Sequence, residues 1–275
     1  MLRVVRSSAS RFLTTARLGT ISPFASRFSS VRSISDAAPF QKVQIPMVDI
    51  DTKFDAYVVG KHDAPGIIVL QDWLGVDYHV KNHALRISQL GGGFKALIPD
   101  LYRGNAKQLF HGIDWVDCVM GIISTTKWLK TNGSKKVGVI GFCLGGALAI
   151  ASSNLVRNLD AAVAFYGFPS SGHEDPALAD SPLQAHFGEL DNFVGFSDVK
   201  TAKKFVEELK MGESIEDPIA PYEVHIYPGV GHAFMNRSPE GIKRRNNMEL
   251  PHDDEAAVQL AWSRVETWMT KYLAS

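Results

Sequence analysis

The feature that most constrains the fold of this chain is a regular alternation of short apolar runs with longer amphipathic segments. The apolar runs have the length and the β-branched content of buried strands and lie at residues 54–59, 66–72, 94–101, 136–142, 161–166, 183–188 and 222–227. Apolar residues at helical spacing follow most of these runs, at residues 77–90, 116–132, 144–156, 198–210 and 254–273. Strands that are apolar on both faces need cover on both sides of the sheet, which helices between parallel strands supply. The pattern therefore predicts an α/β fold with a mostly parallel central sheet and helices on both faces.

The N-terminal segment differs in composition from the rest of the chain. Residues 1–35 contain six arginines, nine serines and no aspartate or glutamate. This composition is typical of an organelle transit peptide. We therefore expect residues 1–35 to be a disordered, cleavable transit peptide, for the mitochondrion or alternatively for a plastid, and residues 36–275 to form one domain. A basic, disordered tail is the other interpretation of this segment.

Several classes of function are excluded by the remaining composition. Residues 36–275 carry 23 basic and 29 acidic side chains, so the domain has no excess of positive charge for nucleic acid. The short basic run Lys243-Arg244-Arg245, beside an Asn-rich loop, is expected to be simply solvated. No apolar stretch is long enough to span a membrane, and two cysteines cannot form a disulfide scaffold. The expected partner is a small molecule, bound by a monomer or a homodimer.

A strand-to-helix junction at Cys143 carries the strongest chemical signal. The apolar run Val137–Ile140 leads directly into Gly-Phe-Cys-Leu-Gly-Gly at residues 141–146, and a helical pattern begins at once. Such a sharp turn lifts a nucleophile out of the sheet, and the glycines let neighbouring backbone pass closely. The helix N-terminus favours thiolate and offers amide protons to an oxyanion. Cys143 is therefore the candidate nucleophile. A buried structural thiol is the alternative, and it is our interpretation of Cys118.

A nucleophilic thiol needs a base, and the base needs an acid that orients it. In folds with this elbow, the acid follows the nucleophile along the chain and the histidine comes last. Asp191 lies in a polar turn after the run at 183–188, where Glu189 competes with it on chemistry alone. His232 lies in a glycine-bracketed loop after the run at 222–227. Asp191 and His232 are therefore the candidate acid and base.

Five motifs together give the chain a resemblance to the dienelactone hydrolase family of α/β-hydrolases, over nearly all of residues 36–275. They are Leu-Gln-Asp-Trp-Leu-Gly at 70–75, Pro-Asp-Leu-Tyr-Arg-Gly at 99–104, Gly-Phe-Cys-Leu-Gly-Gly at 141–146, Gly-Glu-Leu-Asp-Asn-Phe-Val at 188–194 and Gly-His-Ala-Phe-Met-Asn-Arg at 231–237. The resemblance implies a three-layer α/β/α hydrolase that cleaves an ester or lactone with no metal or organic cofactor. It also implies a triad of Cys143, Asp191 and His232, with an oxyanion hole formed by the backbone amides of Leu144 and Trp73.

The chain departs from the family pattern at Asp72, where the family has glutamate. The resemblance implies that this carboxylate interacts with the cysteine, and aspartate is one methylene shorter; capping of the following turn is the other interpretation. Arg237 and Arg103 are candidates for binding a substrate carboxylate, because arginine offers a forked pair of donors. Each could instead be a surface ion-pair partner.

Three other functions remain open at this stage. A carboxylesterase or thioesterase would use the same residues on another acyl group. A redox sensor would use Cys143 as an oxidisable thiolate, with Cys118 as the only other cysteine. A binding module without catalysis would keep the pocket and form no thioester.

Overall fold

The computed structural model describes residues 3–5 as backbone and residues 40–105, 113–169, 179–212, 220–251 and 254–274 with their side chains. Statements below about what the structure lacks refer to these residues. The predicted transit peptide lies almost entirely outside them. Of that segment only Arg3–Val5 is described. It forms a short strand, β1, which runs antiparallel to the strand at Tyr222–Tyr227.

One nine-stranded sheet forms the centre of the molecule, with strand order β1-β9-β8-β7-β6-β4-β5-β3-β2. The strands after β1 are β2 (Gln41–Pro46), β3 (Lys53–Val59), β4 (Gly66–Leu70), β5 (Lys95–Pro99), β6 (Val137–Phe142), β7 (Ala161–Phe165), β8 (Leu183–Gly188) and β9 (Tyr222–Tyr227). Strands β4 to β9 pair in parallel, whereas β2, β3 and β1 add antiparallel edges. The predicted α/β class and mostly parallel sheet are therefore confirmed.

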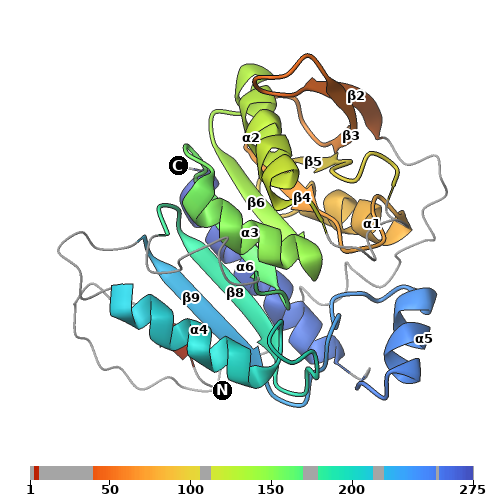
Figure 1. Ribbon diagram of the computed structural model, residues 1–275, viewed down its shortest axis with the longest axis vertical. Helices are drawn as coiled ribbons and strands as arrows, with labels where there is room; N and C mark the ends of the chain where they lie inside the picture. Colours follow the sequence, from red (N-terminus) through yellow and green to blue (C-terminus); the bar gives the residue numbers. More distant parts are fainter. Residues whose placement is uncertain are drawn as a thin grey trace.

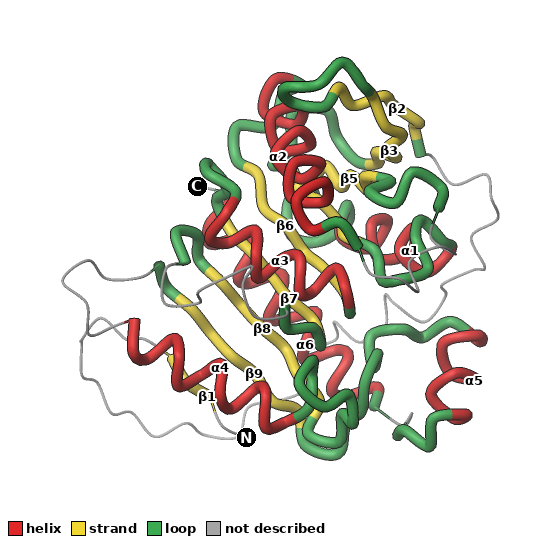
Figure 2. The backbone as a smooth tube through the Cα atoms, in the orientation of Figure 1, coloured by secondary structure: helices red, strands yellow, loops and turns green. Residues whose placement is uncertain are grey.

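Helices cover both faces of the sheet, as Figures 1 and 2 show. They are α1 (Tyr78–Ile87), α2 (Trp115–Thr131), α3 (Leu144–Leu155), α4 (Val199–Gly212), α5 (Pro239–Asn247) and α6 (Glu255–Leu273). Buried residues of α2, α3 and α4 form one apolar core with the sheet, and those of α1 and α6 form a second core on the opposite face. The central strands β4 to β8 are buried along their whole length. This two-sided burial explains why their sequences are apolar throughout instead of alternating.

Three elements were not predicted from the sequence, namely β1, β2 and α5. Strand β2 is an edge strand whose side chains are mostly exposed, so it lacks an apolar pattern. Helix α5 spans the basic run at residues 243–245, and Figure 1 shows this helix to one side of the three layers. The side chain of Ser238 begins this helix by accepting a hydrogen bond from the backbone N–H of Gly241 at 3.0 Å.

The parallel strands place several loops at one edge of the sheet. The loops that follow β4, β5, β6, β8 and β9 leave the carboxyl ends of their strands, where α/β proteins build their binding sites. All the candidate site residues lie in or directly after these loops. Within the described residues, no helix has the length and apolar character needed to cross a membrane.

Candidate active site

Cys143 lies between β6 and α3, where the backbone forms a sharp elbow. Its φ of 55° and ψ of −116° are a conformation that residues with a side chain rarely adopt. The turn is held on both sides, because the Cys143 N–H donates to Phe165 O at 3.0 Å and the Cys143 carbonyl accepts from Ala147 N at 3.1 Å. The thiol is half-buried, not sealed in the core. The structure thus has the elbow geometry that the sequence predicts at Cys143.

Two glycines make this elbow sterically possible. A Cβ atom on Gly141 would lie 1.8 Å from the carbonyl oxygen of Gly145. A Cβ atom on Gly145 would lie 2.5 Å from the carbonyl oxygen of Leu70 and 2.7 Å from that of Gln71. These contacts are with backbone, so a side chain here would push α3 away from the end of β4. The segment that follows β4 is therefore packed directly against the first turn of α3.

Asp191 and His232 come together from the loops that follow the neighbouring strands β8 and β9. Their side chains are buried, and His232 Nδ1 lies 2.7 Å from Asp191 Oδ2. The hydroxyl of Ser197, also buried, lies 3.1 Å from the same ring nitrogen. No sequence pattern marks Ser197 as a site residue, because it precedes α4 and serine is an ordinary residue for such a loop.

The electrostatics of His232 link it to both other members of the predicted triad. Burial lowers the pKa of the imidazole, but hydrogen bonds with Asp191 and Cys143 outweigh burial and raise the pKa to about 10. The imidazole is therefore protonated at neutral pH. The structure brings Cys143, His232 and Asp191 into one hydrogen-bonded chain.

Aromatic side chains fix the plane of the His232 ring. Phe193 stacks on it with ring centroids 4.3 Å apart, and Tyr166 packs edge-on at 5.1 Å. Phe193 follows Asp191 by two residues, and its backbone N–H donates to Asp191 Oδ1 at 3.1 Å. One short turn thus supplies both the carboxylate and the aromatic wall of the imidazole. Phe193 belongs to the motif at residues 188–194, but the sequence alone predicts no role for its side chain.

The loop after β4 contains Asp72 and Trp73. The Asp72 carboxylate accepts from the backbone N–H of Leu74 at 2.8 Å, so it caps its own turn. Burial raises the pKa of Asp72 to about 6, although the Leu74 hydrogen bond opposes this shift. Trp73 is 47% exposed. Leu144 is the first residue of α3, where backbone N–H groups have no carbonyl one turn earlier in the helix.

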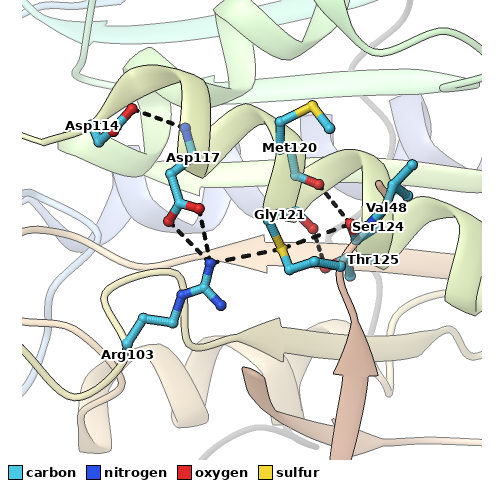
Figure 3. A network of polar contacts seen from close by, with 9 residues as sticks. Val48, Arg103, Asp114, Asp117, Met120, Gly121, Ser124 and Thr125 are labelled. Atoms are coloured by element: carbon cyan, nitrogen blue, oxygen red, sulfur yellow. Dashed lines mark hydrogen bonds and ion pairs between the residues drawn. The ribbon is translucent and has the colours of Figure 1, made fainter. Parts of the chain in front are cut away.

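The two arginines predicted to bind a substrate carboxylate both form ion pairs within the protein. Arg103 Nη2 lies 3.0 Å from each carboxylate oxygen of Asp117 on α2 (Figure 3). The guanidinium of Arg103 also packs over the ring of Phe54. Arg237 pairs with Asp254 and lies 3.4 Å from Glu255 Oε2. These contacts match the ion-pair interpretation that the sequence left open for each arginine.

The basic run on α5 does not match its prediction. Lys243 and Arg244 are exposed, but Arg245 is fully buried, and its Nη1 pairs with the buried carboxylate of Asp254. The prediction of a solvated run is therefore wrong for Arg245. Because Asp254 also pairs with Arg237, a single carboxylate at the start of α6 ties α5 to the segment after His232.

Two further buried side chains near the elbow were not predicted as site residues. The side-chain amide of Gln71 has no hydrogen-bond partner among the described residues, at either its nitrogen or its oxygen. The hydroxyl of Tyr102 has none there either. Both lie in the motifs that carry the family resemblance, directly before Asp72 and Arg103. The sequence signal that could have identified them is a polar side chain within an otherwise apolar motif at the end of a strand.

No group of three histidine, cysteine, aspartate or glutamate side chains within the described part of the chain could hold a metal ion. The pair His79 and His83 on α1 comes closest, with Nε2 atoms 3.0 Å apart. Burial lowers the pKa of His79 to about 3, so its ring is neutral at physiological pH. His83 stacks on Phe142 with ring centroids 4.1 Å apart. The pair is part of the packing beneath the elbow.

Comparison with known proteins agrees with this architecture. The chain is 30% identical to "Protein usf" of Aquifex pyrophilus over 230 residues, which cover 78% of this chain and 90% of the relative. It is 26% identical to the "Carboxymethylenebutenolidase homolog" of Xenopus tropicalis over 257 residues, which cover 87% and 94%. Among solved structures, a "Dienelactone Hydrolase-like Promiscuous Phospotriesterase P91" from metagenomic libraries superposes with a TM-score of 0.60 at 20% identity, covering 85% of this chain and 98% of the other.

The family model of the "Dienelactone hydrolase family" matches residues 54–273. That range runs from β3 to the end of α6 and includes the elbow and both loops that carry Asp191 and His232. The chain belongs to the dienelactone hydrolase family.

Proposed function

We propose that this protein is a cysteine-nucleophile hydrolase of small esters or lactones. The observation that carries the proposal is the position of His232, which hydrogen-bonds to Asp191 on one side and to Cys143 on the other. This is the arrangement of nucleophile, base and orienting acid that covalent hydrolysis needs. Family membership supports the class of bond, because its named relatives include carboxymethylenebutenolidases.

In the proposed acylation step, Cys143 Sγ attacks the carbonyl carbon of the substrate. The backbone N–H groups of Leu144 and Trp73 stabilise the oxyanion. The carbon–oxygen bond then breaks, the His232 imidazolium gives its proton to the leaving oxygen, and a thioester remains on Cys143. In a lactone the leaving alcohol stays attached to the acyl group, so the ring opens.

In the second step, His232 takes a proton from water while the hydroxyl adds to the thioester carbonyl. The intermediate collapses, the thiolate of Cys143 leaves, and the free acid is released. Since thiolate leaves readily, an amide intermediate would revert unless its nitrogen were protonated first. Esters and strained lactones are therefore favoured over peptides.

The nucleophile assignment is tested by removing each of the two cysteines in turn. Cys143→Ala should lower the turnover of 4-nitrophenyl acetate and of a dienelactone by at least about a thousandfold. Cys143→Ser should also lose most activity, because a hydroxyl is far less acidic than a thiol. Cys118→Ala is the matched control, since burial raises the pKa of that thiol to about 12 and it lies in the core. Normal turnover by Cys143→Ala would reject the assignment.

We also propose that residues 1–35 direct the protein to the mitochondrion, with a plastid as the alternative, and that the mature domain is a monomer or homodimer. The support is the Arg-rich, Ser-rich and acid-free composition of that segment. A fluorescent protein fused after residue 35 should enter mitochondria in cells of the source organism. A signal that stays in the cytosol would contradict the targeting proposal.

A further inference from the structure

Tyr102 is buried beside the elbow, and its hydroxyl is unsatisfied. The residue is 5% exposed, and the hydroxyl has no hydrogen-bond partner among the described residues. Native proteins rarely leave a buried polar atom unpaired, because it loses the hydrogen bonds it would make to water. An unpaired group of this kind at a binding site is a candidate for contact with a ligand.

The turn that carries Tyr102 is anchored to α2 on both sides. Leu101 packs into a notch at Gly121, where a Cβ atom would lie only 2.6 Å from Leu101 Cδ2. Arg103 is held by Asp117, at 3.0 Å from both carboxylate oxygens (Figure 3). The ring of Phe54, whose centroid lies 4.8 Å from the Arg103 guanidinium, holds it as well. Tyr102 lies between these two anchors, so its side chain is held in place before any substrate binds.

The surroundings of the Tyr102 hydroxyl place it at the catalytic site. Burial raises its pKa well above the usual value, and the neighbouring Cys118, Asp72 and Cys143 raise it further. The hydroxyl therefore stays protonated and can donate a hydrogen bond. The negative charge of Asp72 nearby also disfavours a carboxylate at this position.

The order of the strands assigns Tyr102 to one side of the nucleophile. Cys143 follows β6, and the loops with Asp191 and His232 follow β8 and β9 on one side of it. Tyr102 follows β5, on the other side and beyond β4. The leaving group must face His232 to receive its proton. The acyl part of the substrate therefore extends towards β4 and β5, where Tyr102 lies.

We propose that Tyr102 is a specificity-determining residue that donates a hydrogen bond to an uncharged oxygen on the acyl side of the substrate. The preferred substrates are then esters or lactones with an ether, hydroxyl or keto oxygen close to the scissile carbonyl. This inference rests on the proposed hydrolase function, because it assumes acyl transfer to Cys143.

The test uses two isosteric substrates, 4-nitrophenyl methoxyacetate and 4-nitrophenyl butyrate, which differ only by an ether oxygen in place of a methylene. The ratio of their kcat/KM values is measured for the wild type and for Tyr102→Phe, so that intrinsic reactivity cancels. Loss of one hydrogen bond should lower the methoxyacetate-to-butyrate ratio about threefold to tenfold. Butyrate hydrolysis should be unchanged or faster. Tyr272→Phe is the matched control, because its hydroxyl is also unpaired but lies at the far end of α6 against Trp268.

A second measurement needs no variant. The wild-type ratio should exceed the ratio for hydroxide-catalysed hydrolysis of the same two esters by a similar factor. Equal ratios for the wild type and Tyr102→Phe, or a wild-type ratio equal to that of hydroxide, would overturn the role of Tyr102 and leave the hydrolase proposal intact. If the wild type hydrolysed neither ester, the hydrolase proposal itself would fail, and this inference with it.

Discussion

At the scale of single residues, the hydrogen bond between Asp191 and His232 controls the charge of the imidazole. His232 needs its proton to release an alkoxide leaving group, and its pKa of about 10 keeps that proton through neutral pH. For an alkyl ester, kcat/KM should therefore be maintained through neutral pH and should decline as the pH rises through about 10. This alkaline limb is the signature of the proposed acid.

Replacing Asp191 tests this control directly. Asp191→Asn removes a negative partner that raises the pKa of His232, so the alkaline limb should move to lower pH. The maximal rate should fall by about 10²- to 10⁴-fold, since the ring also loses its orienting acceptor. The measurement is kcat/KM against pH with an alkyl ester. Glu189→Gln, which removes the competing carboxylate, should leave the limb in place. An unmoved limb in Asp191→Asn would contradict the assignment.

Asp72 affects stability through its burial. Its folded-state pKa of about 6 lies above the ordinary aspartate value of 3.8, so the folded protein binds the proton more tightly than the unfolded chain. Stability therefore falls as the pH rises between these two values and stays reduced above them. Asp72→Asn keeps an acceptor for Leu74 and should stabilise the protein at neutral pH by on the order of 2 kcal/mol, with no gain at acidic pH below the unfolded value.

Guanidinium unfolding at neutral and acidic pH measures this difference. Asp77→Asn is the control, because asparagine also caps helices and this residue caps α1 by accepting from Val80 N at 2.9 Å. A gain in stability for Asp72→Asn that is the same at both pH values would show that burial of charge is not its cause.

At the scale of elements, the contact between β4 and α3 holds together the two segments whose backbone amides would form the proposed oxyanion hole. A methyl group on Gly145 would meet the carbonyl oxygens of Leu70 and Gln71 at 2.5 and 2.7 Å. Gly145→Ala should therefore destabilise the fold by about 2–3 kcal/mol and lower activity, because it separates Trp73 from Leu144. Thermal unfolding and ester turnover measure the two effects.

The matched control is Gly92→Ala, where no atom lies within 4 Å of the new Cβ, and it should change neither stability nor turnover. A Gly145→Ala variant as stable as wild type would contradict this packing argument.

The sequence predicts the elements that have an apolar pattern, which are the strands buried on both faces of the sheet and the helices buried on one face. Strands β4 to β9 and helices α1, α2, α3, α4 and α6 were all expected within a few residues. Strand β2 and helix α5 were not, because an exposed edge strand and a helix with few buried residues have no such pattern. The buried state of Arg245 depends on Asp254, a partner that helix periodicity cannot reveal.

At the scale of the whole molecule, the sheet brings residues far apart in the chain to one edge. The sequence predicts Cys143, Asp191 and His232 as candidates because each lies in the turn or loop that follows a recognisable strand. It does not predict the ion pairs of Arg103 with Asp117 and of Arg237 with Asp254, since these depend on which helix packs against which loop. The unpaired hydroxyl of Tyr102 likewise becomes visible only when its surroundings are known.

The central claim is that the acyl group passes through Cys143, and the covalent intermediate tests it most directly. Wild-type protein is mixed with 4-nitrophenyl acetate, quenched in acid within one turnover, digested and analysed by peptide mass spectrometry. The account predicts an acetyl group on the peptide that contains Cys143, removable by neutral hydroxylamine as a thioester is. An acetyl group on another residue, or steady turnover with Cys143 never labelled, would contradict it.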